Sequence, residues 1–346
     1  MIIGDVAAFV DESRVAFADA CAQLGRVDRR YRLGPTVLQL HIAGQSFADS
    51  LDTTFAHLRV ADDAEPGLTI SVWDRATSGV AMPRAPWTPE AYQGKNEIEL
   101  SVTDRYAASY EVGAHSLSLF DRDQRSAMFW TRDATALPSW EFSSPFRSIF
   151  HWYFGDTSLQ PIHAGAVGTE DGGILIGGRS GIGKTTTTIS CVRGGLRYAS
   201  DDYILADTAA AHAYSLFNSA RFTDDSLVRF PEFAASVVNP TRGPDDKALV
   251  YGHHAFGDQV VVGLPIRGIA VPRVTGLSAT TIAAVSPAVA VRALAPTTIA
   301  HLPGGGPSTL AKITQLCRSV PCIELAVGTD LAALPVAISD WLASNG

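Results

Sequence analysis

A single phosphate-binding pattern constrains this chain more than any other feature of its sequence. The run from Gly178 to Thr185, GRSGIGKT, fits the pattern G-x-x-x-x-G-K-[ST]. Glycines in such a loop let backbone N–H groups turn toward anionic oxygens, and the helix that starts there adds the positive end of its dipole. The apolar run GGILIGG precedes the loop and TTTTISCVR follows it, which predicts a strand, the loop and a helix in that order. The pattern therefore predicts an α/β unit that binds a nucleotide through its phosphates.

The residues of this loop are expected to hold ATP and Mg²⁺ together. Lys184 can reach the β- and γ-phosphates, and the hydroxyl of Thr185 can hold Mg²⁺. Arg179 lies inside the loop but need not touch a phosphate. The predicted nucleotide-binding residues are Gly178, Arg179, Ser180, Gly181, Ile182, Gly183, Lys184, Thr185 and Thr186.

Two adjacent acids follow the predicted helix at the distance of one short strand. Asp201 and Asp202 come at the end of the run LRYAS, which can return the chain to the phosphates. Mg²⁺ needs a carboxylate or water neighbour beyond the loop, so one acid can serve the metal while the other accepts a proton. Adjacent residues of a strand point to opposite faces. Both acids can therefore reach one site only if the strand ends or bends there.

Taken together, these residues resemble the catalytic domain of bacterial HPr kinase/phosphorylase and its relatives. His163, the loop, Gly194 and the acidic pair follow one another in the order and at the separations of that family. The resemblance covers about residues 155–346. It implies an α/β (α+β) domain with a mixed sheet, like that of phosphoenolpyruvate carboxykinase, rather than a doubly wound Rossmann sheet.

The resemblance also implies a role for each residue of the site. Asp201 would be the general base that takes the proton from an acceptor serine hydroxyl, Asp202 would help to hold Mg²⁺, and His163 would tune or relay the proton. The roles of the two aspartates could be exchanged. A serine hydroxyl is a weak nucleophile at neutral pH, so a positioned carboxylate suits the reaction.

The chain departs from the bifunctional enzyme in its middle segment. The glycine-rich RGLG signature is absent, and the first 150 residues do not resemble that enzyme's N-terminal domain. The layout is more similar to the HPr-kinase-like proteins of peptide natural-product clusters, including lasso-peptide kinases, and the ending RSVPCIELAVG is also typical of them. This subgroup implies an acceptor serine on a peptide or small protein.

The first part of the chain predicts a smaller, β-rich N-terminal domain over residues 1–155, before a P-loop domain over residues 156–346. Short β-prone runs with polar–apolar alternation recur here, which indicates a sheet rather than an αβαβ series: TVLQLHIAG, GLTISVWD, NEIELSVTD and HSLSLFDRDQRSAMFW. Residues 5–25 predict one helix. A second helix, rich in aromatic residues, is predicted to start at Ser144-Pro145 and to end at Gly155. Recognition of a peptide is the expected role of this domain.

Three basic residues are weaker candidates for the site. Lys247 lies in the polar stretch RGPDDKALVYGHH, and Arg267 lies between two strand-like runs; both are candidates for a phosphate or substrate contact. Lysine is rare here, with only Lys95, Lys184, Lys247 and Lys312 among 27 basic residues. Arg221 is a further, less supported candidate. The pair His253-His254 has no third ligand at a useful spacing and predicts a solvated loop.

Composition limits the partners and the location. The net charge of −8 argues against nucleic acid or an anionic membrane as the main partner. The four cysteines show no metal-like spacing, and no signal peptide or membrane-spanning run is evident, so a cytoplasmic protein with free thiols is expected. Assembly into a homo-oligomer is a further expectation. Two other functions stay open: a nucleotide-binding module without transfer, and a kinase of a small hydroxyl compound.

Overall fold

The chain forms two compact units of mixed helix and strand. The computed structural model describes residues 4–61, 65–93, 97–98, 105–244 and 246–345. The first unit comprises Met1–Tyr153 with His301–Gly304, and the second comprises Phe154–Ala300 with Gly305–Gly346. The change of unit after Tyr153 lies close to the predicted boundary at residue 155. The short segment 301–304 belongs with the first unit, which no feature of its sequence indicates.

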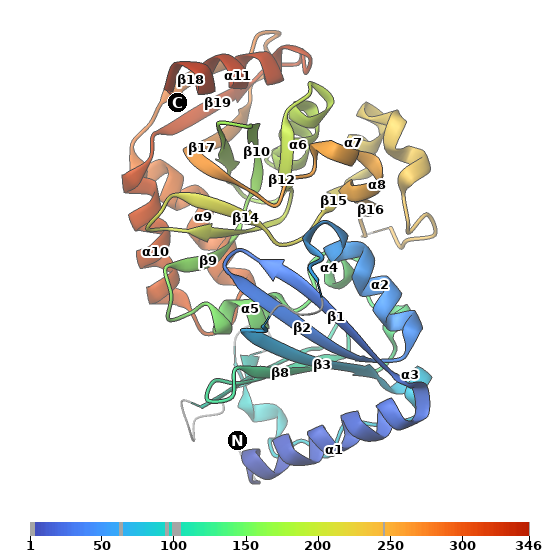
Figure 1. Cartoon of the computed structure of the whole chain (residues 1–346). Coiled ribbons are helices and arrows are strands. Elements are labelled where there is room, and N and C mark those ends of the chain that lie inside the picture. The colour runs from blue at the N-terminus through green and yellow to red at the C-terminus, as the bar shows by residue number, and fades with distance from the viewer. Residues whose placement is uncertain (1–3, 62–64, 94–96, 99–104, 245, 346) are drawn as a thin grey trace. The chain divides into compact units, whose positions relative to one another are not determined.

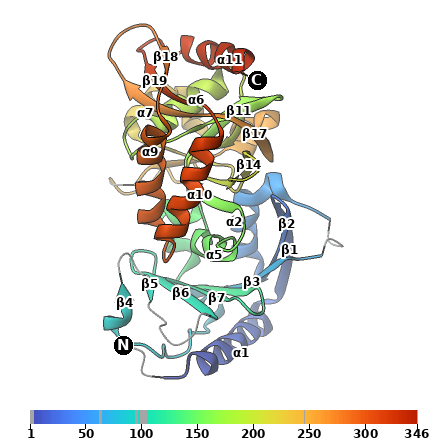
Figure 2. The same cartoon turned by 90° about the vertical axis from the view of Figure 1, so that its left-hand side faces the viewer.

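The first unit is built on one sheet with helices beside it (Figures 1 and 2). Its strands are β1 (Arg26–Leu33), β2 (Thr36–Ala43), β3 (Leu68–Asp74), β4 (Tyr92–Gln93), β5 (Glu97–Ile98), β6 (Tyr106–Glu111), β7 (Ser116–Asp121) and β8 (Ser126–Thr131). Its helices are α1 (Val6–Leu24), α2 (Gln45–Phe55), α3 (Arg75–Ser78), α4 (Ser139–Phe142) and α5 (Arg147–Tyr153). The described strands pair in the order β1-β2-β3-β8-β7-β6-β5-β4.

The predicted N-terminal helix is confirmed, and a second helix corrects the prediction for this region. Asp5 caps α1 by accepting a hydrogen bond from the backbone N–H of Ala7 at 2.8 Å. The helix α2 lies between β2 and β3, which are parallel, so this part of the unit is a βαβ crossover. The expectation of a sheet without such a unit was therefore wrong at this point. Most of the predicted strand 96–104 lies outside the described residues.

Both faces of this sheet are covered, which corrects the predicted polar–apolar alternation. Trp130 of β8 packs in a core cluster with Phe9 of α1, whereas the neighbouring Phe129 meets Phe146 at 5.1 Å between ring centroids on the other face. Adjacent strand residues point to opposite faces, so apolar residues in succession indicate burial on both sides. The aromatic segment before residue 155 is largely buried and contains the helix α5, which begins at Arg147 rather than at the predicted Ser144-Pro145.

The second unit carries a nine-stranded sheet and a separate two-stranded one. Its strands are β9 (Leu159–His163), β10 (Gly165–Thr169), β11 (Gly172–Ile176), β12 (Arg197–Ser200), β13 (Tyr203–Asp207), β14 (His212–Ser215), β15 (Ser219–Phe222), β16 (Ala248–Tyr251), β17 (Gly263–Val274), β18 (Thr281–Ala284) and β19 (Cys322–Val327). Its helices are α6 (Lys184–Arg193), α7 (Asp224–Arg229), α8 (Gly252–Ala255), α9 (Pro287–His301), α10 (Gly306–Ser319) and α11 (Ala333–Asn345).

The large sheet is mixed, as the resemblance implies, and the unit has the predicted α/β class. The strands β11, β17 and β19 run parallel to one another, and the other described pairings in this sheet are antiparallel. Helices cover both faces (Figure 2). Ile174 and Ile176 of β11 belong to the cluster that contains α6 and α11, whereas Leu175 belongs to the cluster that contains α9 and α10. The three residues are fully buried, which holds β11 and the loop that follows it between two layers of helix.

Two antiparallel runs of this sheet break at the same level, and we call this line the crease. β9 and β10 are separated at Ala164, and β12 and β13 are separated at Asp201 and Asp202. Across the crease, His163 pairs with Tyr203 on one side and Ala166 pairs with Ser200 on the other. The Ser200 hydroxyl lies 2.8 Å from the Tyr203 carbonyl oxygen and 3.2 Å from that of Ala164, which bridges both breaks. The strand therefore ends at the acidic pair, as the predicted site required.

Gly194 allows the end of α6 to pack against α11, and a substitution there is expected to destabilise the second unit. A Cβ at Gly194 would lie 2.3 Å from Cγ of Pro335 and 2.4 Å from its Cβ. Overpacking of this kind costs about 1–3 kcal/mol, so Gly194→Ala should lower the free energy of unfolding by about that amount. Urea unfolding measures it. Gly243→Ala is the control, because no atom of the described residues lies within 4 Å of a Cβ there, and equal stability of both variants would contradict the prediction.

Lys312 of α10 supports the start of the second unit. Its ammonium donates to the carbonyl oxygens of Gly155 at 2.7 Å and of Phe154 and Leu159 at 3.2 Å each. Burial lowers the pKa of this amine. An ammonium has three donors around one atom, whereas a guanidinium is a planar fork, so an arginine cannot replace it.

Substitution of Lys312 by either methionine or arginine is expected to destabilise the protein. Lys312→Met removes a charged donor that three carbonyls share and should cost about 1–3 kcal/mol, since hydrogen bonds to charged groups are strong. Lys312→Arg should recover little of this loss. Thermal unfolding of both variants provides the measurement, and a wild-type transition for Lys312→Arg would show that charge alone is sufficient.

Candidate functional site

The predicted site residues meet in one cleft of the second unit. The cleft has a volume of about 910 Å³. Eleven predicted residues line it: His163, Ser180, Gly181, Gly183, Lys184, Thr185, Thr186, Asp201, Asp202, Arg221 and Lys247. They come from the end of β9, the phosphate loop, the start of α6, the crease, β15 and the segment before β16. Side chains that lie as much as 84 positions apart are thus brought to one place, since 247 − 163 = 84.

The phosphate loop has the backbone shape that its glycines predict. Gly178 has a φ of 145° and Gly183 has a φ of 103°. Both angles lie in the positive-φ region that residues with a Cβ atom rarely adopt. A Cβ at Gly178 would also lie 2.6 Å from Cγ2 of Ile182, so the loop closes tightly on itself. α6 starts at Lys184 without a side-chain cap, which leaves its first N–H groups for an anion.

Lys184 lies across the loop and faces the acids. Its ammonium donates to the carbonyl oxygen of Gly178 at 2.9 Å and lies 3.5 Å from that of Arg179. Its side chain is buried, and burial lowers its pKa, while the charges of Asp202 and Asp201 oppose that shift. A buried cation held in this way suits binding to a phosphate.

Asp201 is joined to the loop through Thr185. Its Oδ2 accepts a hydrogen bond from the Thr185 hydroxyl at 3.0 Å and another from the backbone N–H of Arg221 at 3.1 Å. Its Oδ1 is buried and has no hydrogen-bond partner among the described residues. Burial raises the pKa of the Asp201 carboxyl, while the hydrogen bonds from Arg221 and Thr185 oppose that shift.

Asp202 has a different environment from its neighbour. Its Oδ1 lies 2.8 Å from Nε2 of His163, and its Oδ2 lies 3.9 Å from a guanidinium nitrogen of Arg221. Burial disfavours its charged form, yet the hydrogen bond and charge interaction with His163, together with Arg221 and Lys184, hold its pKa below the usual range. The backbone N–H of His163 donates to the Thr298 hydroxyl at 3.0 Å, which fixes the imidazole's strand against α9.

The residues beside the loop fit Mg²⁺. A magnesium ion bound together with a nucleotide needs one or two carboxylates, a hydroxyl, phosphates and water. Thr185 and Asp201 provide the hydroxyl and the carboxylate, and the buried Oδ1 of Asp201 is an acceptor that a cation would satisfy. Within the described parts of the chain, no group of three or more His, Cys, Asp or Glu side chains could by itself hold a metal ion.

The weaker candidates divide between the cleft and the outside. Lys247 lines the cleft, and so does Arg221. Arg267 does not line it: its Nε donates to the carbonyl oxygen of Asp171 at 3.1 Å, beside the start of β11 and so at the opposite end of that strand from the loop. The candidate contact of Arg267 with phosphate therefore has no support in this geometry. His253 is exposed on α8 and lies outside the cleft.

The sequence did not point to the rest of the cleft wall. Residues of α7 and its cap line one part, and residues at the ends of β17 and β19 line another: Thr223, Asp225, Ser226 and Arg229, and Val274, Val327, Gly328, Thr329 and Leu331. The Thr223 hydroxyl caps α7 by accepting from the N–H of Ser226 at 3.2 Å. That capping pattern is visible in the sequence, but nothing in it places α7 beside the phosphate loop.

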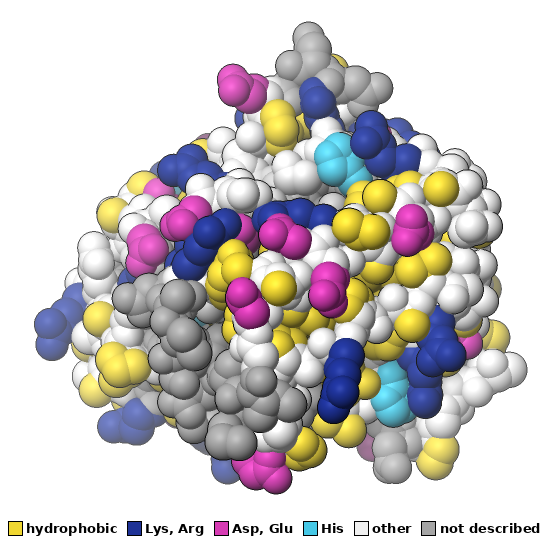
Figure 3. Space-filling view, turned by 90° about the horizontal axis from the view of Figure 1, so that it is seen from below, with side chains coloured by type: hydrophobic (Ala, Val, Ile, Leu, Met, Phe, Trp, Pro, Cys, Tyr) yellow, Lys and Arg dark blue, Asp and Glu magenta, His cyan; other side chains and the backbone are white. Residues whose placement is uncertain are grey.

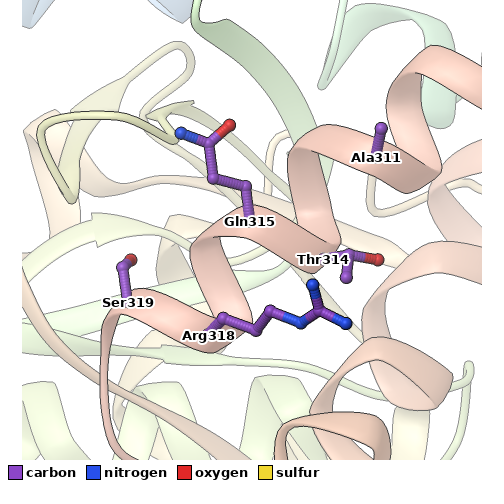
Figure 4. Close-up of a pocket in the computed structure, with 5 residues that line it drawn as sticks. All are labelled: Ala311, Thr314, Gln315, Arg318 and Ser319. Atoms are coloured by element: carbon purple, nitrogen blue, oxygen red, sulfur yellow. The ribbon is translucent and has the colours of Figure 1, made fainter.

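A second hollow, on α10, lacks converging chemistry. It has a volume of about 530 Å³ and is lined by Ala311, Thr314, Gln315, Arg318 and Ser319. Figure 4 shows that Gln315 and Arg318 point away from each other. No acid and no pair of groups suited to proton transfer lines this hollow, so the cleft at the phosphate loop is the stronger candidate.

Three further features of the described residues bear on the expectations drawn from composition: surface charge, the cysteines and the helices. On the described part of the face in Figure 3, basic side chains alternate with acidic and apolar ones rather than forming one basic surface. The cysteines Cys21, Cys191, Cys317 and Cys322 are free thiols, as predicted. Among the described residues, no helix has the length and apolar character that crossing a membrane requires.

The cleft thus presents a phosphate loop, a hydroxyl and two carboxylates in different environments within one cavity. Neither the models of known protein families nor the curated proteins compared with this chain give a match.

Proposed function

We propose that this chain is an ATP- and Mg²⁺-dependent kinase that transfers the γ-phosphoryl group to a serine hydroxyl of a peptide or small protein. The observation that supports it most is the link between the phosphate loop and the acidic pair, through the 3.0 Å hydrogen bond from Thr185 to Asp201. A binding module needs the loop alone. A second carboxylate, held beside a histidine and open to the same cleft, has a use when a hydroxyl must lose its proton.

The geometry favours exchanging the roles that the sequence suggested for the two aspartates. In many phosphate-loop enzymes the metal is held by the loop Ser/Thr and a strand-end aspartate. Asp201 bonds the Thr185 hydroxyl, so it is the acid on the metal side. Asp202 has no described bond to the loop and is paired with His163 instead, so it is the acid on the acceptor side.

The proposed transfer then follows from what these residues can hold. The acceptor hydroxyl donates its proton to Asp202 as its oxygen bonds to the γ-phosphorus, and the bond from that phosphorus to the β–γ bridging oxygen breaks to leave ADP. Lys184 and the N–H groups at the start of α6 bind the phosphate charge. Bound Mg²⁺ would supply further neutralisation of that charge. Because such transition states are loose, positioning by Asp202 matters more than its strength as a base.

The resemblance to HPr-kinase-like proteins supports a finer proposal for the fold and the acceptor. The mixed sheet, with the loop between β11 and α6 and with His163 at the end of β9, suits a domain like phosphoenolpyruvate carboxykinase. We infer a peptide acceptor and a cytoplasmic setting from the same resemblance.

The proposed activity is tested with ATP radiolabelled in its γ-phosphate. The full chain is incubated with Mg²⁺, the ATP and a pool of serine-containing peptides, and a matched pool has alanine in place of serine. Label is expected in the serine pool alone, with a mass gain of one phosphoryl group. Nucleotide binding without label in any pool would favour a module without transfer, and label on small hydroxyl compounds alone would favour the other alternative.

A further inference from the structure

Arg221 occupies a fixed position in the cleft that holds the phosphate loop. It lies in β15, where it pairs with Leu249 of β16, and its backbone N–H donates to Oδ2 of Asp201 at 3.1 Å. The Tyr198 hydroxyl donates to the carbonyl oxygen of Ser219 at 2.6 Å and anchors the same strand to β12. The arginine is thus held to the same carboxylate that bonds Thr185, so its distance from the loop is set by the backbone.

The guanidinium of Arg221 has donors that the described residues leave unused. Its side chain is 18% exposed and lines the cleft. Among the described residues, the carboxylate oxygens that pair with it, on Asp246 and Asp202, lie at 3.8 and 3.9 Å, which is beyond hydrogen-bonding distance. Its Nε is buried and has no hydrogen-bond partner in the described part of the chain. Unmet donors on a largely buried cation are costly, so an anion in the cleft would be strongly bound there.

We propose that Arg221 binds the γ-phosphate and is the residue by which this site distinguishes a nucleoside triphosphate from a diphosphate. The inference rests on the proposed function. Two carboxylates face the same cleft and repel a triphosphate, so charge on its terminal group needs a cation beside these acids in addition to Lys184. A guanidinium with free donors matches phosphate oxygens in pairs.

The other cations of the cleft fit this role less well. Arg229, at the end of α7, is exposed, so water competes for its donors. Lys247 lines the cleft, but its backbone N–H donates to the side chain of the adjacent Asp246 and not to Asp201, the acid beside Thr185. Its position relative to the loop is therefore not fixed in the way that the position of Arg221 is. Arg221 combines burial, free donors and a backbone bond to Asp201.

The test compares the affinities of ATP and ADP, which requires no knowledge of the acceptor. Calorimetric titration of Mg-ATP and Mg-ADP into wild type, Arg221→Ala, Arg221→Lys and Arg267→Ala gives the ratio of their dissociation constants. Arg221→Ala should weaken ATP by about tenfold or more, as expected for a lost bond to a charged group, while ADP changes by less than about twofold. Arg221→Lys should fall between, because it keeps the charge without the fork. Arg267→Ala, outside the cleft, should match wild type.

The outcomes separate this inference from the proposed function. Equal losses for ATP and ADP in Arg221→Ala, or no loss for either, would overturn the role of Arg221. If Arg221→Ala does not fold, Arg221→Lys decides, and an unchanged ATP-to-ADP ratio in it overturns the role. If wild type binds neither nucleotide, the proposed function itself fails. If wild type binds ATP and transfers phosphate while the ratio of the ATP and ADP dissociation constants is unchanged in the variants, the proposed kinase activity is supported and only the role of Arg221 is wrong.

Discussion

Asp202→Asn is expected to lower phosphoryl transfer by about 10²–10⁴-fold, the range for loss of a positioned general base, while Mg-ATP binds within a few-fold of wild type. The amide has nearly the shape of the carboxylate but cannot accept the serine proton, and Asp202 has no described bond to the phosphate loop. Rapid-mixing transfer assays with the acceptor peptide measure the rate, and calorimetry measures the affinity.

The neighbouring acid should give the opposite division of effects. Asp201→Asn removes the charge beside Thr185, so it should raise the Mg²⁺ concentration needed for half-maximal ATP binding. Asp207→Asn is the matched control, because Asp207 ends β13, does not line the cleft and keeps its acceptor oxygen as an amide. If Asp202→Asn changes the Mg²⁺ requirement and Asp201→Asn does not, the roles are those that the sequence suggested first.

Lys184→Met should weaken ATP binding by about 10–100-fold and lower transfer by about a further 10²–10³-fold. The ammonium is buried over the loop, and no other described cation bonds the loop carbonyls of Gly178 and Arg179. Methionine keeps the length of the side chain without its charge. The measurements are calorimetric binding of ATP and single-turnover transfer.

Lys184→Arg is the informative companion of this variant. The guanidinium keeps the charge, but its planar fork is larger than the ammonium that fits over the loop, so little activity should return. Thermal unfolding controls for loss of fold in both variants. Wild-type affinity for ATP in Lys184→Met would show that the loop does not bind phosphate through this residue.

The sequence predicted best where a local pattern fixes local shape. The phosphate loop was predictable because Gly178 and Gly183 can adopt the positive φ angles that such a loop requires. The sequence also predicted that both acids could reach one site only if the strand ended or bent there, and β12 does end at the crease. α2 was missed because its run, QSFADSLDTTF, is rich in residues that favour caps and turns. Its buried Phe47, Leu51 and Phe55 recur every four residues and were the available signal.

Tertiary detail could not be predicted in the same way. Which aspartate meets Thr185 depends on how two carboxylates leave the crease, and strand alternation does not specify that. The prediction that Arg267 contacts phosphate failed because β17 runs parallel to β11. A residue in the first half of β17 therefore lies at the end of β11 that is far from the loop. Arg221 is brought to the cleft by pairing of β15 with β16, whose partners are about 30 residues apart in the chain.

The crease also separates two kinds of constraint on chain length. A residue added within β10 or β12, or within β9 or β13, shifts the strand pairing only on its own side of the crease. The alternation of side chains between the two faces of the sheet starts again on the other side of the crease. Between Ser200 and Tyr203 an added residue would move a carboxylate away from Thr185 or from His163. Packing therefore constrains the lengths of these strands, whereas the chemistry of the site constrains the two-residue interval between β12 and β13. The strands can be lengthened on either side of the crease without changing the spacing of the two acids.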